Sequence, residues 1–370
     1  MFKLLNNRIV FLDILRAFAV IAMIQGHTVD ILLRQSYRGN ESFMYYLWNF
    51  NRGLTAPIFL FTAGCVFTFV FRNKNLPFSR NPRVKKGLIR AVFLILIGYL
   101  IKFPTSDLLH YANISQKNWL GFYAIDVLQL IGVGLILLMI LFYIHEKLRL
   151  NIYRLLVSSA LLLIVLSVVC ELVDWYMYLH PFPAGYLNMG TGAKFPLLPN
   201  LVYILAGAVL GHYIAISRDA IKSSQLRKTL LSYGIILILA YELLNFLHHL
   251  TGNPLNILSK TTNMVFIRTG MVILIVLIIM ELSVKVRRLP RIIQITGTYT
   301  LLIYVVHLFI LYGSAWNRGI AYYYAYSFSF LESVLSALVL IFFMVLLAYF
   351  ANYVETTKGW LSKTLDNYFK

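Results

Sequence analysis

The residues that could best take part in a chemical reaction lie in the first apolar stretch, which reads DILRAFAVIAMIQGH over residues 13–27. An aspartate, an arginine and a histidine interrupt this stretch, at Asp13, Arg16 and His27. On a helix, the eleven steps from Arg16 to His27 advance about 16 Å and close roughly three turns, so both side chains share a face. Asp13 can pair with Arg16, and Asp30 lies three residues beyond His27. The segment predicts one polar stripe along a buried helix.

An imidazole held in such a stripe can do acid–base or nucleophilic chemistry. Histidine exchanges its proton near neutral pH and can also carry an acyl group. Ionisable side chains are costly inside a membrane and usually line a pathway or a site. A structural interpretation stays open, in which Asp13 and Arg16 form a buried ion pair and His27 is a satisfied interior histidine. We expect a catalytic centre of His27, Arg16 and Asp30, supported by Asp13.

The composition places these residues in an integral membrane protein. Of the 370 residues, 60% are hydrophobic and only 13% are charged, whereas about a quarter of the residues of soluble domains are charged. Apolar runs of about 20 residues recur along almost the whole chain. The net charge of +19 comes from cations between these runs, which is typical of topology signals and argues against nucleic-acid binding. The two cysteines, Cys65 and Cys170, predict neither a disulfide framework nor a thiolate zinc site.

The apolar runs predict an all-α, polytopic helix bundle of about ten transmembrane helices in a single domain, 1–370. The expected spans are 9–33, 50–71, 88–103, 120–144, 154–173, 197–216, 229–250, 263–283, 292–313 and 331–353, the last followed by a tail to residue 370. Segments after even-numbered spans are rich in lysine and arginine, so both termini are predicted to face the cytoplasm. The longest outward segment, 174–196, is rich in aromatics, glycine and proline, which suits an interfacial belt or a cover over a substrate.

Further polar residues occur mostly at outer depths of later spans. These possible supporting residues are Asp126, Gln129, Glu242, Arg268, Tyr304 and His307. Glu242 lies well within its span, although a pairing with Arg268 would make it structural. The adjacent His248 and His249 point in different directions from a helix and are more simply interfacial. No spacing of His, Asp and Glu completes a ligand set, so no metal is predicted.

Several stretches, in consistent order, resemble the transmembrane acyltransferase superfamily, which includes acyltransferase family 3. Arg16 and His27 lie in a first span that begins shortly after RIVFLD. Further stretches are similar to the branch named after heparan-alpha-glucosaminide N-acetyltransferase, and these are APIFLFTAGCVFTF (56–69), DVLQLIG (126–132), FPLLPNLVYILAGAVLG (195–211) and YTLLIYVVH (299–307). The resemblance covers residues 9–310.

The resemblance implies that an acyl group, usually acetyl, moves from cytosolic acetyl-CoA to an acceptor at the other membrane face, commonly a sugar. Arg16 and His27 then match the family's arginine–histidine pair, and His307 matches the histidine that closes its late-span motif.

Two departures from the family's pattern bear on which branch the chain resembles. Ala17 stands where glycine is common, and the chain has no histidine between His27 and His110, where the heparan-type branch has its transferring histidine. His27 must then serve, as in acyltransferase family 3.

We therefore expect a multi-pass acyltransferase of the plasma (inner) membrane that uses acyl-CoA and a sugar or glycan acceptor. Arg83, Lys85 and Lys86 are expected to contact the phosphates of the cofactor, although solvated lipid-facing segments are the commoner explanation for such cations. Arg16 is expected to anchor the thioester end of the cofactor or to hold Asp13.

Two questions stay open at this point. His27 either takes the acceptor's proton or is itself acylated, and Asp30, Asp126 or Glu242 is expected to orient its ring. The alternative function is a proton-coupled secondary transporter or flippase, because the same intramembrane groups suit transport. The chain shows no convincing correspondence between its halves of the kind that many transporters have.

Overall fold

The computed structural model describes residues 10–39, 42–73, 76–106, 114–187, 189, 193, 195–250, 260–286 and 289–368. Nearly all of these residues are helical, and the two short strands form one hairpin. The chain divides into two compact units, of which the first comprises Met1–Thr55 with Lys285–Lys370 and the second comprises Ala56–Val284. The structure is therefore the all-α bundle that the apolar runs predict.

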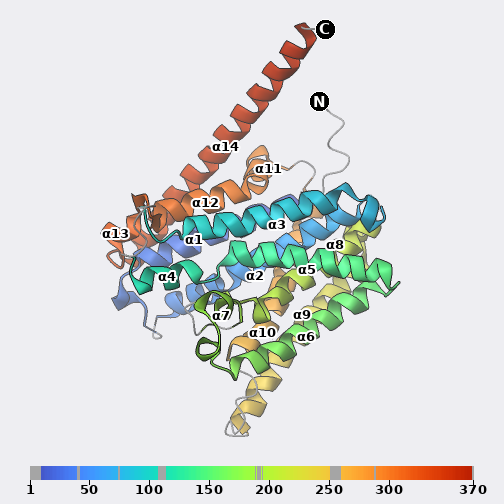
Figure 1. Cartoon of the computed structure of the whole chain (residues 1–370), viewed down its shortest axis with the longest axis horizontal. Coiled ribbons are helices and arrows are strands. Elements are labelled where there is room, and N and C mark those ends of the chain that lie inside the picture. Colours follow the sequence, from blue (N-terminus) through green and yellow to red (C-terminus); the bar gives the residue numbers. More distant parts are fainter. Residues whose placement is uncertain are drawn as a thin grey trace. The chain divides into compact units, whose positions relative to one another are not determined.

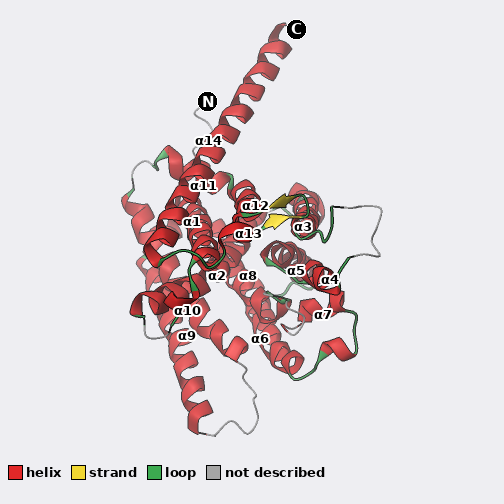
Figure 2. Cartoon of the chain, turned by 90° about the vertical axis from the view of Figure 1, so that its left-hand side faces the viewer, coloured by secondary structure: helices red, strands yellow, loops and turns green. Residues whose placement is uncertain are grey.

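The first unit holds the elements from both ends of the chain. They are α1 (Val10–Leu32), η2 (Gln35–Tyr37), the beginning of α2 (Phe43–Arg72), α11 (Arg291–Thr298), α12 (Thr300–Leu311), β1 (Gly313–Ser314), β2 (Asn317–Arg318), α13 (Ile320–Tyr324) and α14 (Phe330–Tyr368). Helix α1 packs against α11, α12 and α14 (Figure 1). The short β1–β2 hairpin contacts α12 (Figure 2).

The second unit holds the middle of the chain. It contains the rest of α2, η3 (Phe78–Arg80), α3 (Pro82–Ile101), α4 (Gln116–Tyr123), α5 (Val127–Lys147), α6 (Ile152–Glu171), η5 (Trp175–Met177), α7 (Pro181–Leu187), α8 (Leu197–Ile216), η7 (Arg218–Lys222), α9 (Ser224–Leu250) and α10 (Lys260–Lys285). Its main helix pairs are α3 with α5 and α6 with α8 (Figure 1). Within the predicted outward segment, residues 188, 190–192 and 194 lie outside the described residues.

Each predicted span corresponds to helix, and the number of candidate spans in the part of the chain described is consistent with the expected bundle of about ten. Eight helices there are long and apolar enough to cross a membrane, and a ninth span arises if α11 and α12 are counted as one. Helix α3, the predicted third span, does not qualify because Lys85, Lys86 and Arg90 all lie within its twenty residues. Within the predicted span 292–313, the chain is bent by 73° between α11 and α12.

The outer surfaces of several helices are those of a membrane protein. Helices α6 and α9 bury only 17% and 11% of their most apolar stretches. Leu161, Leu162 and Val165 of α6 are each more than half exposed. Large exposed apolar surfaces are unfavourable in water but are at no disadvantage against lipid tails. The chain is therefore a multi-pass integral membrane protein.

Glycines bring α2 and α8 into backbone contact inside the second unit. A Cβ atom at Gly207 would overlap the carbonyl oxygen of Phe61, and one at Gly64 would overlap that of Ile204. Gly207 and Gly211 are four residues apart, which is the small-residue spacing that lets membrane helices approach closely. The glycines in the stretch 195–211 therefore set the distance between these two helices.

We expect Gly207→Ala to destabilise the protein by roughly 1–3 kcal/mol, because the added methyl meets backbone that cannot rotate away. Thermal unfolding in detergent measures this. Gly121→Ala is the matched control, since a Cβ there meets nothing within 4 Å. Equal unfolding midpoints for the two variants would contradict the close approach of α2 and α8.

Candidate functional site

Two histidines and a tyrosine from opposite ends of the chain come together in the first unit. The ring centres of His27 on α1 and His307 on α12 are 5.6 Å apart. Nδ1 of His27 lies 3.0 Å from the Tyr312 hydroxyl, just after α12 ends. His27 is half-buried, and Tyr312 is 38% exposed. The structure thus joins the predicted residue His27 to the predicted residue His307 across 280 positions of sequence.

His307 has a defined hydrogen-bonding state. Its Nδ1 lies 2.9 Å from the carbonyl oxygen of Ile303, so Nδ1–H donates to that carbonyl and Nε2 is left as an acceptor in the neutral ring. This Nε2 is buried and has no hydrogen-bond partner among the described residues. The predicted residue Tyr304 is also buried, and its ring meets that of His307 edge-on at 5.6 Å. A buried acceptor without a partner is costly unless a ligand or water completes it.

The contact with Tyr312 determines what the His27 ring can do. If Nδ1–H donates to the Tyr312 oxygen, Nε2 carries the lone pair that a general base or nucleophile needs. Tyr312 then fixes the ring orientation, which is the role that the sequence assigned to Asp30, Asp126 or Glu242. Sequence analysis missed Tyr312, which lies five residues beyond His307 and outside the stretch 299–307.

The other end of the polar stripe on α1 also meets α11 and α12. Asp13 is buried, and a Cβ atom at Gly297 would lie 2.7 Å from its carbonyl oxygen. Arg16 Nη2 donates to the Thr300 hydroxyl over 3.5 Å. Contacts therefore pair Asp13 with Gly297, then Arg16 with Thr300, then His27 with His307, so the two segments run in the same direction. The pairing of Asp13 with Arg16 stays a prediction.

Asp30 is engaged with two arginines that sequence analysis did not single out. Its carboxylate forms ion pairs with Arg52 and, at 3.5 Å, with Arg38. Arg38 also donates to the backbone carbonyls of Asp30 and Leu33. Arg38 follows the predicted first span, and Arg52 is a cation within the predicted second span, which was the available signal. The contacts favour a structural task for Asp30 at the end of α1, and its predicted part in orienting His27 stays a prediction.

The end of α1 is completed by residues from the far end of the chain. The last carbonyls of a helix have no partner within it and need one elsewhere, above all in lipid. Here the amide of Tyr326 donates to Ile31 over 2.9 Å, and that of Phe328 donates to Leu32 over 2.9 Å. Together with Arg38, these amides satisfy four successive carbonyls from Asp30 onward.

Asp126 and Gln129 have a clear local function in the second unit. Asp126 is the N-cap of α5 and forms a capping box with Gln129, which accepts from the Asp126 amide over 3.3 Å. Lys102 makes an ion pair with Asp126 at 3.0 Å. These contacts stabilise the start of α5, and the supporting chemical role expected of the two residues stays a prediction.

The remaining predicted residues of the second unit have the following surroundings. Glu242 is exposed on α9, and Arg268 lies near the buried hydroxyl of Tyr203. Arg83, Lys85 and Lys86 are exposed in the first turns of α3, whose N-cap Asn81 accepts from the Arg83 amide over 2.9 Å. Among the described residues, no three His, Cys, Asp or Glu side chains lie together as metal ligands would.

The family model described as heparan-alpha-glucosaminide N-acetyltransferase, catalytic, matches residues 8–251 of the chain. This match covers well over half of the sequence and includes α1, with Arg16 and His27. Helix α12, with His307, follows the matched region. No curated protein matches the chain.

The contacts at the end of α1 generate a stability prediction. Arg38→Ala leaves the carbonyls of Asp30 and Leu33 without their donor, and such a loss costs about 1–3 kcal/mol for a buried group. Arg34→Ala is the matched control, because the guanidinium of Arg34 donates an exposed hydrogen bond to the Ser327 carbonyl. We expect a clearly lower unfolding midpoint for Arg38→Ala than for Arg34→Ala. If the control is as unstable as Arg38→Ala, the proposed importance of these carbonyls is wrong.

Proposed function

The chain belongs to the heparan-alpha-glucosaminide N-acetyltransferase catalytic family, and from that membership we propose a specific transfer reaction. An acyl group, acetyl in the first instance, moves from acyl-CoA on the cytoplasmic side of the plasma membrane to a sugar or glycan on the other side. The observation that carries the proposal is the cluster of His27, His307 and Tyr312, because it gives the matched first helix a base with a fixed orientation.

His27 acts in this proposal through Nε2. With Nδ1–H donating to Tyr312, Nε2 takes the proton from an acceptor hydroxyl or amine as that heteroatom attacks the thioester carbonyl. The new bond joins the acceptor to the acyl carbon, the carbon–sulfur bond breaks, and the CoA thiolate leaves with the proton that His27 returns. In a two-step route, Nε2 itself attacks the thioester and then passes the acyl group to the acceptor.

His307 supports either route as a positioning residue. Its Nε2 carries a lone pair, so it can accept a hydrogen bond from a second N–H or O–H of the sugar beside the His27 ring. This contact would also relieve the cost of leaving Nε2 buried without a partner. Asp30 acts indirectly, since its ion pairs with Arg38 and Arg52 hold the end of α1 that follows His27.

The donor is proposed to be held by cations. Arg16 lies about 16 Å along α1 from His27, which leaves room for the thioester arm of the cofactor between them. Exposed guanidinium and ammonium groups bind phosphate well, and Arg83, Lys85 and Lys86 are exposed at the start of α3. Asp13, Asp126, Gln129, Glu242, Arg268 and Tyr304 are proposed as supporting residues only.

The function is tested with sealed vesicles of both orientations, labelled acetyl-CoA outside and a sugar acceptor inside. We expect label on the enclosed sugar only when the cytoplasmic face meets acetyl-CoA, and a loss of about 100-fold or more in His27→Ala. His249→Ala is the control, since this exposed histidine ends α9 and should leave the rate unchanged.

Two results would contradict this assignment. Equal rates in His27→Ala and the unchanged protein would remove His27 from the reaction. Passage of unmodified sugar or of intact acetyl-CoA across the membrane, without label on the sugar, would favour the secondary transporter or flippase instead.

The two routes through His27 are separated by omitting the acceptor. Direct transfer predicts no protein-bound label when the protein is mixed with labelled acetyl-CoA alone. The two-step route predicts up to one label per chain, absent from His27→Ala and released on adding the sugar. Label that persists in His27→Ala would place the acyl group on another residue and would contradict both routes.

A further inference from the structure

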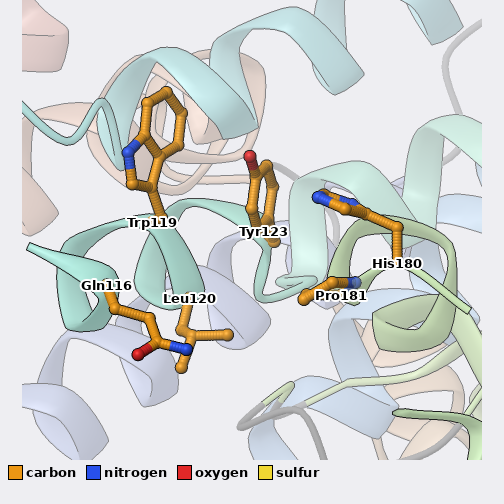
Figure 3. A pocket seen from close by; sticks show the side chains of 6 residues that line it. All are labelled: Gln116, Trp119, Leu120, Tyr123, His180 and Pro181. Atoms are coloured by element: carbon orange, nitrogen blue, oxygen red, sulfur yellow. The ribbon is translucent and has the colours of Figure 1, made fainter. Parts of the chain in front are cut away.

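A small pocket lies between α4 and the start of α7 in the second unit. Its volume is about 270 Å³, and its lining is made of Gln116, Trp119, Leu120, Tyr123, His180 and Pro181 (Figure 3). Sites for drug-sized ligands run from about 300 to 1,000 Å³, so this one suits a single ring rather than a long chain. One wall begins in the predicted outward segment before the span 120–144 and continues into the start of that span, and the other wall belongs to the predicted outward segment 174–196.

Aromatic rings form one side of the pocket. Trp119 and Tyr123 are one turn apart on α4, and their rings are nearly parallel, with an angle of 20° and centres 5.6 Å apart. His180 points toward Tyr123 and meets its ring at 5.1 Å (Figure 3). Trp119 and Tyr123 are only half-buried, so their rings are accessible to a ligand. The arrangement is an aromatic surface with a histidine at its edge.

The polar side chains of the lining can form hydrogen bonds. The Phe182 amide donates to Nδ1 of His180 over 3.2 Å, so in the neutral ring the proton is on Nε2, which can donate to a ligand. The Gln116 side chain provides both a donor and an acceptor. Among the described residues, the lining contains no Asp, Glu, Lys or Arg that could form an ion pair with a phosphate or a carboxylate.

The walls of the pocket are fixed by contacts behind them. Lys102 donates to the Ala124 carbonyl over 3.1 Å, directly after α4, while also pairing with Asp126. On the other wall, the hydroxyls of Tyr186 and Tyr99 are 2.7 Å apart, which ties α7 to α3. A pocket whose shape is set in advance loses less entropy when it binds a ligand.

We propose that this pocket is a saccharide subsite for one pyranose ring of the acceptor. One face of a pyranose carries C–H groups that pack on an aromatic surface such as Trp119 and Tyr123, through apolar and weak C–H interactions. Its hydroxyls are donors and acceptors that match Gln116 and His180. The statement that the bound ring belongs to the acceptor rests on the proposed function. The statement that a sugar ring binds here rests on the pocket alone.

Aromatic residues also gather at membrane interfaces without binding any ligand. An interfacial belt does not require a pocket, a side-chain amide beside the rings or a histidine held in one tautomer. The combination of these features at one place favours the subsite. The experiment nevertheless includes the interfacial belt as an outcome.

The test measures binding by saturation-transfer NMR, with the full-length protein in nanodiscs, methyl glucoside and glucosamine as probes, and sorbitol as an open-chain control. We expect signal from the ring C–H groups of both pyranoses and little from sorbitol. Trp119→Ala should weaken binding roughly ten-fold. Trp119→Phe should restore most of it because a ring remains.

The control variant is Tyr178→Ala, which removes an exposed aromatic residue of the same outward segment that does not line the pocket. Unchanged binding in Tyr178→Ala and an unchanged unfolding midpoint in Trp119→Ala would locate the effect at the pocket. Equal binding by Trp119→Ala and the unchanged protein, or equal signal from sorbitol and the pyranoses, would overturn the subsite in favour of an interfacial belt.

The transfer assay then separates this inference from the proposed function. A rise of roughly ten-fold in KM for the sugar in Trp119→Ala, with kcat unchanged, supports the subsite as part of acceptor binding. Transfer with an unchanged KM would refute its role toward the acceptor and leave the transferase intact. If sugar binding depends on Trp119 but the unchanged protein never acetylates a sugar, the proposed function fails and the sugar site stands.

Discussion

The arrangement around His27 depends on one requirement, which is that the last carbonyls of a helix in an apolar environment must find donors. The donors for α1 are the amides of Tyr326 and Phe328 and the guanidinium of Arg38. The first two belong to the segment between α13 and α14, close in sequence to Tyr312. Satisfying this helix end therefore brings the far end of the chain to α1, and His27 meets His307 and Tyr312 as a consequence.

A second constraint aligns α1 with α11 and α12 near the beginning of α1. Gly297 lies against the backbone of Asp13, where any larger residue would meet the carbonyl oxygen. The break of 73° between α11 and α12 follows directly after this glycine. With α1 held at Gly297 and again beyond His27, little freedom remains for the imidazole to slide relative to α12. Such a fixed position favours catalysis, because a preorganised group does not have to be reoriented in each turnover.

Sequence patterns predict only part of this arrangement. Apolar runs predicted the position of every span because hydrophobicity is a local property, but the cations of α3 and the bend after Gly297 reduced the number of clear spans. The spacing of Asp126 and Gln129 already matched a capping box and could have assigned them to the start of α5. The partners of His27 and Asp30 could not be read locally, since Tyr312 and Arg52 reach them only through packing of distant segments.

The central claim is that the His27 imidazole is where the acyl group meets its acceptor. The most direct measurement is an experimental structure with a non-transferable acyl-CoA analogue and a sugar bound together. The account predicts the thioester carbonyl and one sugar hydroxyl or amine within about 3.2 Å of each other or of Nε2 of His27, with the Tyr312 contact intact. A thioester bound elsewhere, with His27 facing only lipid, would contradict it.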